Sequence, residues 1–141
     1  MQEQPISLTQ LRVIEKHLDK MFGALKLDVV FTKHFFERLN DPRNIDQITP
    51  AELIKVFTSL YEKYGVTLSH IGSDEEIDRL VHSISTDINI PIQVLYDKKT
   101  KKIDIISKTI MRVDKFFSKS KELPVESLIL TFNQFCESKH F

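Results

Sequence analysis

The sequence is poor in cysteine and glycine, and it contains no long hydrophobic run. Its one cysteine, Cys136, cannot form an internal disulfide, which predicts a protein of a reducing cytoplasm. Three glycines are too few for a glycine-rich phosphate loop, so P-loop and dinucleotide-binding proteins are excluded. There is no run of about 18 apolar residues and no charged-then-apolar leader, so we expect no membrane partner.

The sequence also lacks the motifs that hold metals in proteins. Its five histidines are scattered, and neither Cys-x-x-Cys nor His-Glu-x-x-His occurs. Cys136 falls on the apolar stripe of a predicted helix, which indicates a core residue rather than a nucleophile. The acidic run from Asp74 to Asp78 is typical of charge at the start of a helix. We therefore expect no metal and no cofactor.

What remains is the composition of one globular domain. A chain of 141 residues with 41% hydrophobic residues buries a core without disulfides or metals. The patterns along it predict an α+β fold, a helix-rich single domain with a small antiparallel sheet in the second half. We divide it into an N-terminal helix (1–26), a central helix-plus-sheet unit (27–120) and a C-terminal helix (121–141).

Helix-start signals and helical spacing of apolar residues predict two helices near the N-terminus. Ser7 and Gln10 have the form of a capping box, and the apolar residues after them predict a helix over 8–24. Thr32 is placed to cap a second, short helix that continues through Leu39.

A third helix has the clearest start signal in the chain. Thr49 caps it, proline fits its first turn, and Glu52 completes a capping box. We expect this helix over 50–64, with Gly65 placed to end it.

Two further helices are predicted, one from a start signal and one from its amphipathic pattern. Ser73 and Glu76 form another capping box, and apolar residues at helical spacing predict a helix over 74–85. An amphipathic pattern predicts a last helix over 124–137.

The residue pattern changes to short β-branched runs after Asp87. Runs at 90–96 and 103–112 flank a polar turn, which predicts a β-hairpin. The apolar run 27–31 is either a strand or a connection. We expect one core from both halves of the chain, containing Phe57, Leu60, Ile77, Leu80, Val94, Ile105, Leu128 and Phe132.

Charge is unevenly distributed in this neutral protein. Nine basic and three acidic residues lie between Asp97 and Lys121, a net charge of +6. A cationic ribbon is a plausible contact for nucleic-acid phosphates. The alternative is a lysine-rich hairpin tip that stays soluble and resists pairing at its edge. The candidate phosphate contacts are Lys98, Lys99, Lys101, Lys102 and Lys115.

Two side chains of the predicted short helix suit phosphodiester chemistry. His34 and Arg38 stand one helical turn apart and therefore share a face. Histidine moves protons near neutral pH, and arginine forks onto phosphates. The alternative is a solvated histidine beside an arginine that pairs with a nearby acid.

A second candidate cluster lies on or just after the second hairpin strand. If the strand continues, Lys108, Ile110 and Arg112 share one face of it, with Thr109 on the other. Two cations on a rigid strand can hold a phosphate and stabilise a transition state without a metal. The alternative is an edge strand that uses cations to avoid pairing with other chains.

These residues occur within four blocks that resemble a family of small uncharacterised proteins of tailed bacteriophages. The blocks are His34–Asn44, Ile48–Leu53, Asp87–Pro91 and Lys108–Arg112. In element order the chain also resembles, more distantly, the barnase, EndoU, colicin and RelE-like superfamily of ribonucleases. The resemblance covers neither the first nor the last predicted helix.

The resemblance implies a metal-independent endoribonuclease in which the ribose 2′-OH attacks the adjacent phosphorus. His34 would carry a proton, Arg38, Lys108 and Arg112 would stabilise the phosphorane, and Thr109 would donate a hydrogen bond. RNA is then the expected partner, and the host bacterial cytoplasm the expected location. Two alternatives stay open: a non-catalytic phage protein that binds a host protein or nucleic acid, and a virion or assembly component. A real active site should bring the side-chain tips of the histidine and the three cations into one concavity.

Overall fold

The structure is a computed structural model that describes residues 4–44, 46–113, 116 and 118–126. Three α-helices and six strands form an α+β domain, which confirms the predicted fold class. The elements are α1 (Leu8–Phe22), the 3-10 turn η1 (Gly23–Leu25), β1 (Leu27–Phe31), α2 (Lys33–Leu39), α3 (Pro50–Leu68), β2 (Glu76–Ser83), β3 (Ile88–Asp97), β4 (Lys102–Ser107), β5 (Met111–Arg112) and β6 (Lys121–Val125).

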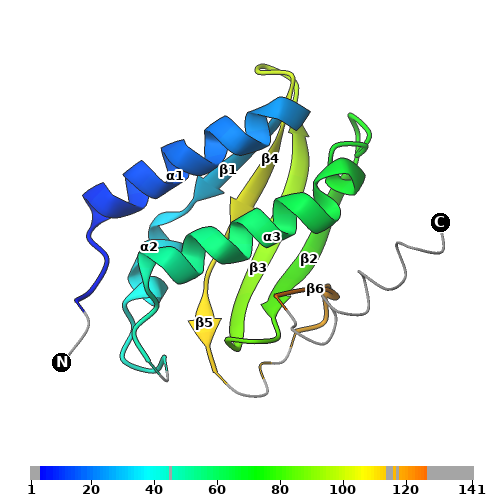
Figure 1. Cartoon of the computed structure of the whole chain (residues 1–141). Helices are drawn as coiled ribbons and strands as arrows, with labels where there is room; N and C mark the ends of the chain where they lie inside the picture. Colours follow the sequence, from blue (N-terminus) through cyan, green and yellow to red (C-terminus); the bar gives the residue numbers. More distant parts are fainter. Residues whose placement is uncertain (1–3, 45, 114–115, 117, 127–141) are drawn as a thin grey trace, which may run out of the picture.

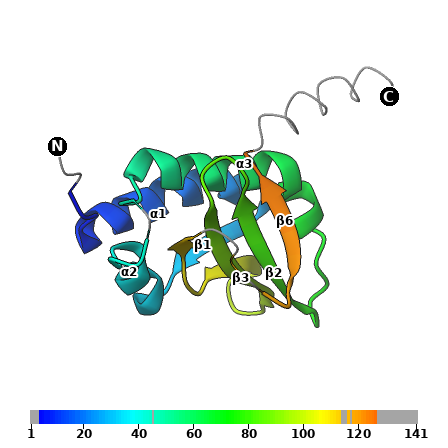
Figure 2. The same cartoon turned by 90° about the horizontal axis from the view of Figure 1, so that it is seen from below.

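One mixed sheet forms the framework, and its strand order is β1-β4-β3-β2-β6 (Figure 1). The β1–β4 and β2–β6 pairs are parallel, while β2–β3 and β3–β4 are antiparallel. The sheet is therefore mixed rather than wholly antiparallel as predicted, and β1 joins it from the first half of the chain. The short β5 also pairs with β3, beyond the end of β4. Helices α1 and α3 lie side by side on one face of this sheet (Figure 2). We call the other face the helix-free face.

The predicted helix starts of α1 and α3 are confirmed. The backbone N–H of Gln10 donates to Ser7 Oγ (3.1 Å), and the Ser7 N–H donates to Gln10 Oε1 (2.8 Å). Thr49 and Glu52 make the same reciprocal pair at the start of α3. Each box satisfies two N–H groups that a helix end otherwise leaves without a partner.

Gly65 does not end α3, which continues three residues further to Leu68. The glycine instead allows a close approach between α3 and the turn η1. A Cβ atom built at Gly65 would lie 3.1 Å from Leu25 Cδ1 and 3.2 Å from Tyr61 Cδ1. Both distances are tighter than ordinary packing contacts.

The prediction of a helix over 74–85 is wrong, because Glu76–Ser83 is strand β2. Its apolar residues fit a strand as well as a helix. Ile77 pairs with Val94 and Val81 pairs with Ile90, so both side chains face the helices, whereas Leu80 lies on the helix-free face. Eight residue pairs with β3 form this ladder, and such long-range pairing overrides a local capping signal.

The second hairpin strand is shorter than predicted. β4 ends at Ser107, and Met111–Arg112 form the separate strand β5. The predicted last helix over 124–137 is wrong at its start, because Lys121–Val125 is strand β6. The rest of that predicted helix lies outside the described residues.

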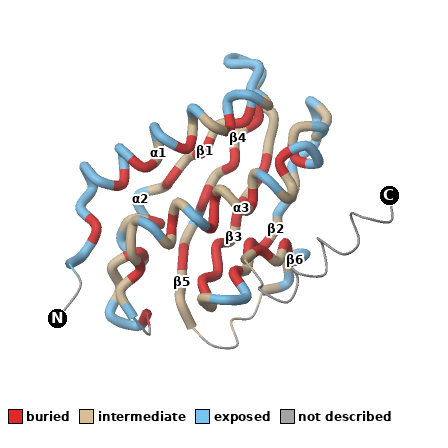
Figure 3. The backbone as a smooth tube through the Cα atoms, in the orientation of Figure 1, coloured by how far each residue is buried: buried red, intermediate tan, exposed pale blue. Residues whose placement is uncertain are grey.

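The core fills the space between the sheet and the two long helices, where the buried positions cluster (Figure 3). Phe31, Phe35 and Phe57 are buried there with rings in contact. Of the eight predicted core residues, Phe57, Leu60, Val94 and Ile105 lie in this core, and Ile77 packs against it. Leu80 is buried on the opposite face, and Leu128 and Phe132 lie outside the described residues.

Carboxylates of α1 cover the outer edge of β1. The Val29 N–H donates to Asp19 Oδ1 and the Phe31 N–H donates to Glu15 Oε2, both at 2.8 Å. These N–H groups would otherwise be free to pair with another strand. The contacts block one edge of the sheet and also tie α1 to it.

The Asp19 carboxyl at this edge should make the free energy of unfolding depend on pH. Burial, with a smaller contribution from the hydrogen bond and charge of Asp28, raises the pKa of Asp19 from 3.8 to about 7, although the Val29 hydrogen bond opposes the shift. A raised pKa favours folding at low pH, and this contribution is lost as pH rises from about 4 to about 7. Asp19→Asn keeps an acceptor for Val29 and removes the charge. It should stabilise the protein on the order of 1 kcal/mol at pH 8, after a discount for solvent screening, and much less at pH 4.

Urea unfolding at the two pH values measures this effect, with Asp46→Asn at an exposed position as the control. The same gain at both pH values would show that Asp19 is not the titrating group.

Candidate functional site

The first predicted cluster lies on the exposed side of α2. Thr32 caps this helix through the Phe35 N–H (3.0 Å), and Phe35 and Leu39 anchor it in the core. His34 and Arg38 therefore share the outer face as predicted, and Arg38 Nε lies 3.4 Å from His34 Nε2. In this contact the Arg38 Nε–H donates to the His34 imidazole.

A single carboxylate serves both arginines of this region. Asp41 Oδ2 lies 3.0 Å from Arg38 Nη1 and 2.8 Å from Arg43 Nη2. Asp41 Oδ1 also accepts from Arg43 Nε (3.1 Å). One negative charge between two guanidinium groups leaves an excess positive charge beside His34.

The second predicted cluster begins where α2 meets the end of β4. The Thr32 hydroxyl lies 3.3 Å from the Ser107 carbonyl oxygen and 3.0 Å from that of Lys108. The Thr32 N–H also donates to the Ser107 oxygen (3.3 Å). Residues about 75 positions apart in sequence are thus held together. We call the segment of α2 with His34 and Arg38, together with Lys108 and Thr109, the α2–β4 junction.

Lys108 lies toward the helix-free face of the sheet. Its Nζ is 3.4 Å from Asp78 Oδ1, and Asp78 pairs with Gln93, whose position faces away from the helices. Both side chains of this ion pair are about half exposed, at 48% and 57%. Exposed pairs of this kind contribute about 0–1 kcal/mol and exchange easily for another anion.

Arg112 points to the other side of the sheet, which corrects the predicted common face with Lys108. Because the strand breaks after Ser107, Arg112 instead pairs with Ile88 in the ladder and reaches the start of α3. Its guanidinium contacts both carboxylate oxygens of Glu52, and Nη2 also donates to the Gln47 carbonyl (3.1 Å).

This contact ties the end of the hairpin to the start of α3. Only 11% of the Arg112 side chain is exposed. Burial alone would raise the pKa of Glu52, but the Arg112 and Thr49 hydrogen bonds and the Arg112 charge outweigh it and lower that pKa. The Arg112 guanidinium is therefore a structural group. Its contacts are with Glu52 and Gln47, whereas the Lys108 ammonium lies at Asp78 and Arg38 at Asp41, so the four predicted tips have different partners.

The cationic ribbon of the sequence is divided among several places. Lys98, Lys99, Lys101 and Lys102 are exposed at the β3–β4 turn, where Lys98 Nζ lies 3.9 Å from Asp74 Oδ1. Lys115 lies outside the described residues. Among the described residues, the basic side chains that are close in sequence therefore do not form one continuous surface patch.

A pocket that the sequence patterns did not indicate lies between α3 and the strands β2 and β6. Its cations are Arg79 and Lys121, which are far apart in sequence: Lys121 ends the cationic ribbon, and Arg79 lies outside it. The register of two parallel strands brings them together, and only the pairing of β6 with β2 could have indicated it.

Within the described residues no group of three or more histidine, cysteine or acidic side chains is arranged to hold a metal ion. No described helix is long and apolar enough to cross a membrane.

No family model, no curated protein and no solved structure matches this chain. The resemblance to tailed-phage proteins and to the ribonuclease superfamily stays a prediction.

Proposed function

We propose that the protein binds RNA at the α2–β4 junction as a ribonuclease-like protein. The observation that carries the proposal is the pair of Thr32 hydroxyl contacts, which hold the start of the helix of His34 and Arg38 against the backbone of Ser107 and Lys108. The two segments that carry the clusters predicted for phosphate chemistry therefore meet through their backbones. Phosphate oxygens are the natural ligand for a surface with a guanidinium, an ammonium and a hydroxyl.

The charge at the junction supports phosphate binding. Asp41 is shared by two arginines, so one positive charge at α2 has no counterion of its own among its described contacts. The ion pair of Lys108 is exposed, and a phosphate can replace Asp78 at little cost. Each phosphate bound in this way releases counterions, so the affinity should fall with salt.

A second candidate is cleavage of the bound RNA, and the position of the exposed His34 imidazole beside the Arg38 guanidinium favours it. A general base needs a free lone pair, so Nε2 would have to leave the Arg38 Nε–H before it takes a proton from the RNA. In this reaction His34 takes the proton of the 2′-OH, the 2′-oxygen bonds to phosphorus, and the bond to the 5′-oxygen breaks. The Lys108 ammonium is the candidate acid for the leaving oxygen. The products are a 2′,3′-cyclic phosphate and a 5′-hydroxyl.

Arg112 takes no part in either proposal. Its guanidinium is held by Glu52 and Gln47 on the side of the sheet that faces the helices. Loss of one of three predicted phosphorane-stabilising cations weakens the case for turnover more than the case for binding, and we therefore place binding first.

Variants at the junction separate the two proposals. Arg38→Ala and Lys108→Ala should each weaken binding of a single-stranded RNA about tenfold at low salt, since each removes a phosphate contact. His34→Ala should leave binding within about twofold, because it removes neither the guanidinium nor the ammonium that contacts phosphate. If the RNA is cleaved, His34→Ala should slow cleavage by at least about 100-fold, the lower range for loss of a general base. Fluorescence anisotropy and gel assays of labelled RNA in EDTA measure both quantities.

Lys99→Ala and Lys101→Ala at the β3–β4 turn are the comparison variants. They should change only the salt-dependent part of the affinity for RNA, because exposed lysines attract phosphates by charge and hold them in no fixed position. Equal and small losses at all four cations would indicate a diffuse electrostatic surface and contradict the junction. Binding without cleavage of any RNA would leave the non-catalytic protein as the function.

A further inference from the structure

Two cations stand side by side on the strands at the β6 edge of the sheet. Arg79 on β2 is the direct neighbour of Lys121 on β6 in the parallel ladder. Arg79 also pairs with Ile92, which is buried toward the helices, so both cations project on the helix-covered side. Like charges directly opposite each other destabilise a sheet unless something neutralises them.

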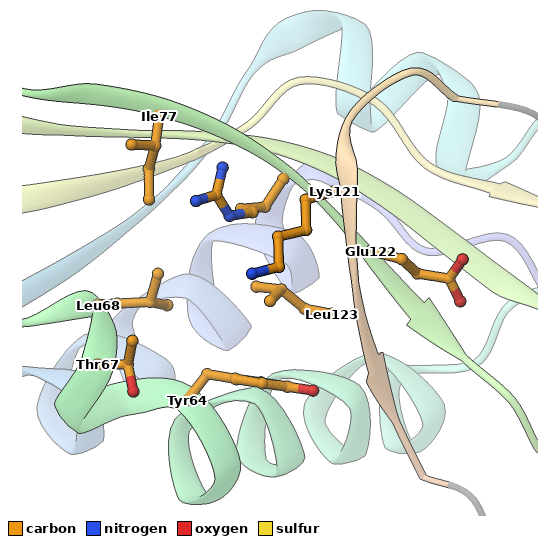
Figure 4. A pocket seen from close by; sticks show the side chains of 8 residues that line it. Tyr64, Thr67, Leu68, Ile77, Lys121, Glu122 and Leu123 are labelled. Carbon is orange, nitrogen blue, oxygen red and sulfur yellow. The ribbon is translucent and has the colours of Figure 1, made fainter.

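Neither cation has a carboxylate partner among the described residues. The only hydrogen bond of the Arg79 guanidinium there is from Nη1 to the Asp78 carbonyl oxygen (2.8 Å). Glu122 also lines the pocket, and its charge adds to the effect of burial in raising the pKa of Tyr64, but Figure 4 shows its carboxylate on the other side of β6 from the Lys121 ammonium. It lies 3.9 Å from His82 Nδ1.

The cations line a pocket with a volume of about 310 Å³. Tyr64, Thr67 and Leu68 of α3 form one wall, and the Lys121 ammonium extends between that wall and the strands (Figure 4). Leu68, Ile77 and Leu123 make much of the remaining lining apolar. A volume near 300 Å³ is at the small end of pockets that hold organic ligands.

Two hydrogen bonds hold the walls of this pocket in place. Lys63 Nζ and the Tyr64 hydroxyl both donate to the Pro124 carbonyl oxygen, at 2.9 and 3.1 Å. Burial lowers the pKa of Lys63, as expected for an ammonium enclosed between α3 and β6. The pocket is therefore preformed, which reduces the entropy that a ligand loses on binding.

We propose that this pocket binds a small organic oxyanion, a phosphate or carboxylate group on an apolar body. The guanidinium and ammonium would bind the oxyanion, and the apolar body would lie against Leu68, Ile77 and Leu123. The site is distinct from the α2–β4 junction, because Arg79 and Lys121 project on the helix-covered side of the sheet, whereas Lys108 lies toward the helix-free face.

Titrations with phenyl phosphate, phenylacetate and inorganic phosphate test the proposal. NMR spectra of the ¹⁵N-labelled protein should show saturable shifts at residues 64–68, 77–79 and 121–123 with at least one of the two aromatic anions. The comparison of phenyl phosphate with phenylacetate identifies the oxyanion. Inorganic phosphate should bind at least about tenfold more weakly than the better aromatic anion, because it lacks the apolar body. Phenol, a neutral probe, should not shift these residues.

Arg79→Gln and Lys121→Gln should each weaken binding at least about tenfold, whereas Lys55→Gln at an exposed position of α3 should not change it. His34→Ala should also bind normally, so failure of the RNA proposal leaves this one intact. The proposal would be overturned if Lys55→Gln lost as much affinity for the aromatic anion as the two pocket variants, or if inorganic phosphate bound as tightly as the aromatic anion. If Arg79→Gln unfolds, Lys121→Gln at its exposed position decides the question alone.

Discussion

Replacing Phe57 by alanine should lower the free energy of unfolding by about 3–5 kcal/mol, the range for emptying a buried aromatic site. Phe57 lies on α3 and is fully buried against the sheet. Its ring meets that of Phe31 edge to face, with centroids 5.3 Å apart. Phe31 in turn stacks on Phe35, with ring centroids 4.6 Å apart. The substitution therefore weakens the packing among β1, α2 and α3.

Urea unfolding measures the loss, and Val66→Ala is the matched control on the same helix. Val66 is 61% exposed, and its truncation should change stability by less than about 0.5 kcal/mol. A loss below about 1 kcal/mol for Phe57→Ala would mean that α3 does not present this face to the sheet.

Arg112→Ala should destabilise the protein by about 3 kcal/mol, the lower end of the range for breaking a buried ion pair. The substitution leaves Glu52 without the charge that lowers its pKa, while 26% of the Glu52 side chain keeps contact with water. It also leaves the Gln47 carbonyl without its donor. Because the pKa of Glu52 is lowered in the folded protein, the ion pair stabilises above the ordinary pKa of glutamate and is lost as pH falls below it.

A double variant separates the ion pair from general damage. Arg112→Met combined with Glu52→Leu removes both charges and should recover at least half of the lost stability, since no charge is then left buried alone. The Glu52→Leu change also removes half of a capping box, at a cost of about 1 kcal/mol, so recovery should be incomplete. A single Arg112 variant as stable as the wild type, with weaker RNA binding, would return Arg112 to the functional site.

Local signals predicted the parts of the fold that local interactions determine. The boxes at Ser7 and Thr49 are contacts between residues three apart, and the structure contains both. The β3–β4 hairpin is also local, because its strands are joined by a short polar turn.

The parts that could not be predicted depend on distant partners. The same apolar spacing after Ser73 fits a helix or a strand. The strand is favoured by parallel pairing with β6, about 40 residues later, in addition to the adjacent hairpin partner β3. The run Leu27–Phe31 becomes a strand only because β4, about 75 residues later, lies beside it.

In the candidate site, too, local spacing predicted some residues correctly, and distant pairing determined the others. His34 and Arg38 share a face because helical spacing requires it. Lys108 and Arg112 do not, because the strand between them breaks and Ile110 turns into the core. The pairing of Arg79 with Lys121 is a property of the sheet register, which no spacing in the sequence encodes.

The most direct test of the RNA site is a titration of ¹⁵N-labelled protein with a 2′-O-methylated RNA hexanucleotide, which binds but cannot react. If RNA binds at the α2–β4 junction, we expect the amide signals of His34, Arg38, Lys108 and Thr109 to shift together and to saturate with one dissociation constant. Signals around Arg112, and those of residues 64–68 in the pocket, should stay in place. Shifts confined to the lysines of the β3–β4 turn, or spread evenly over the surface, would contradict a site at the α2–β4 junction.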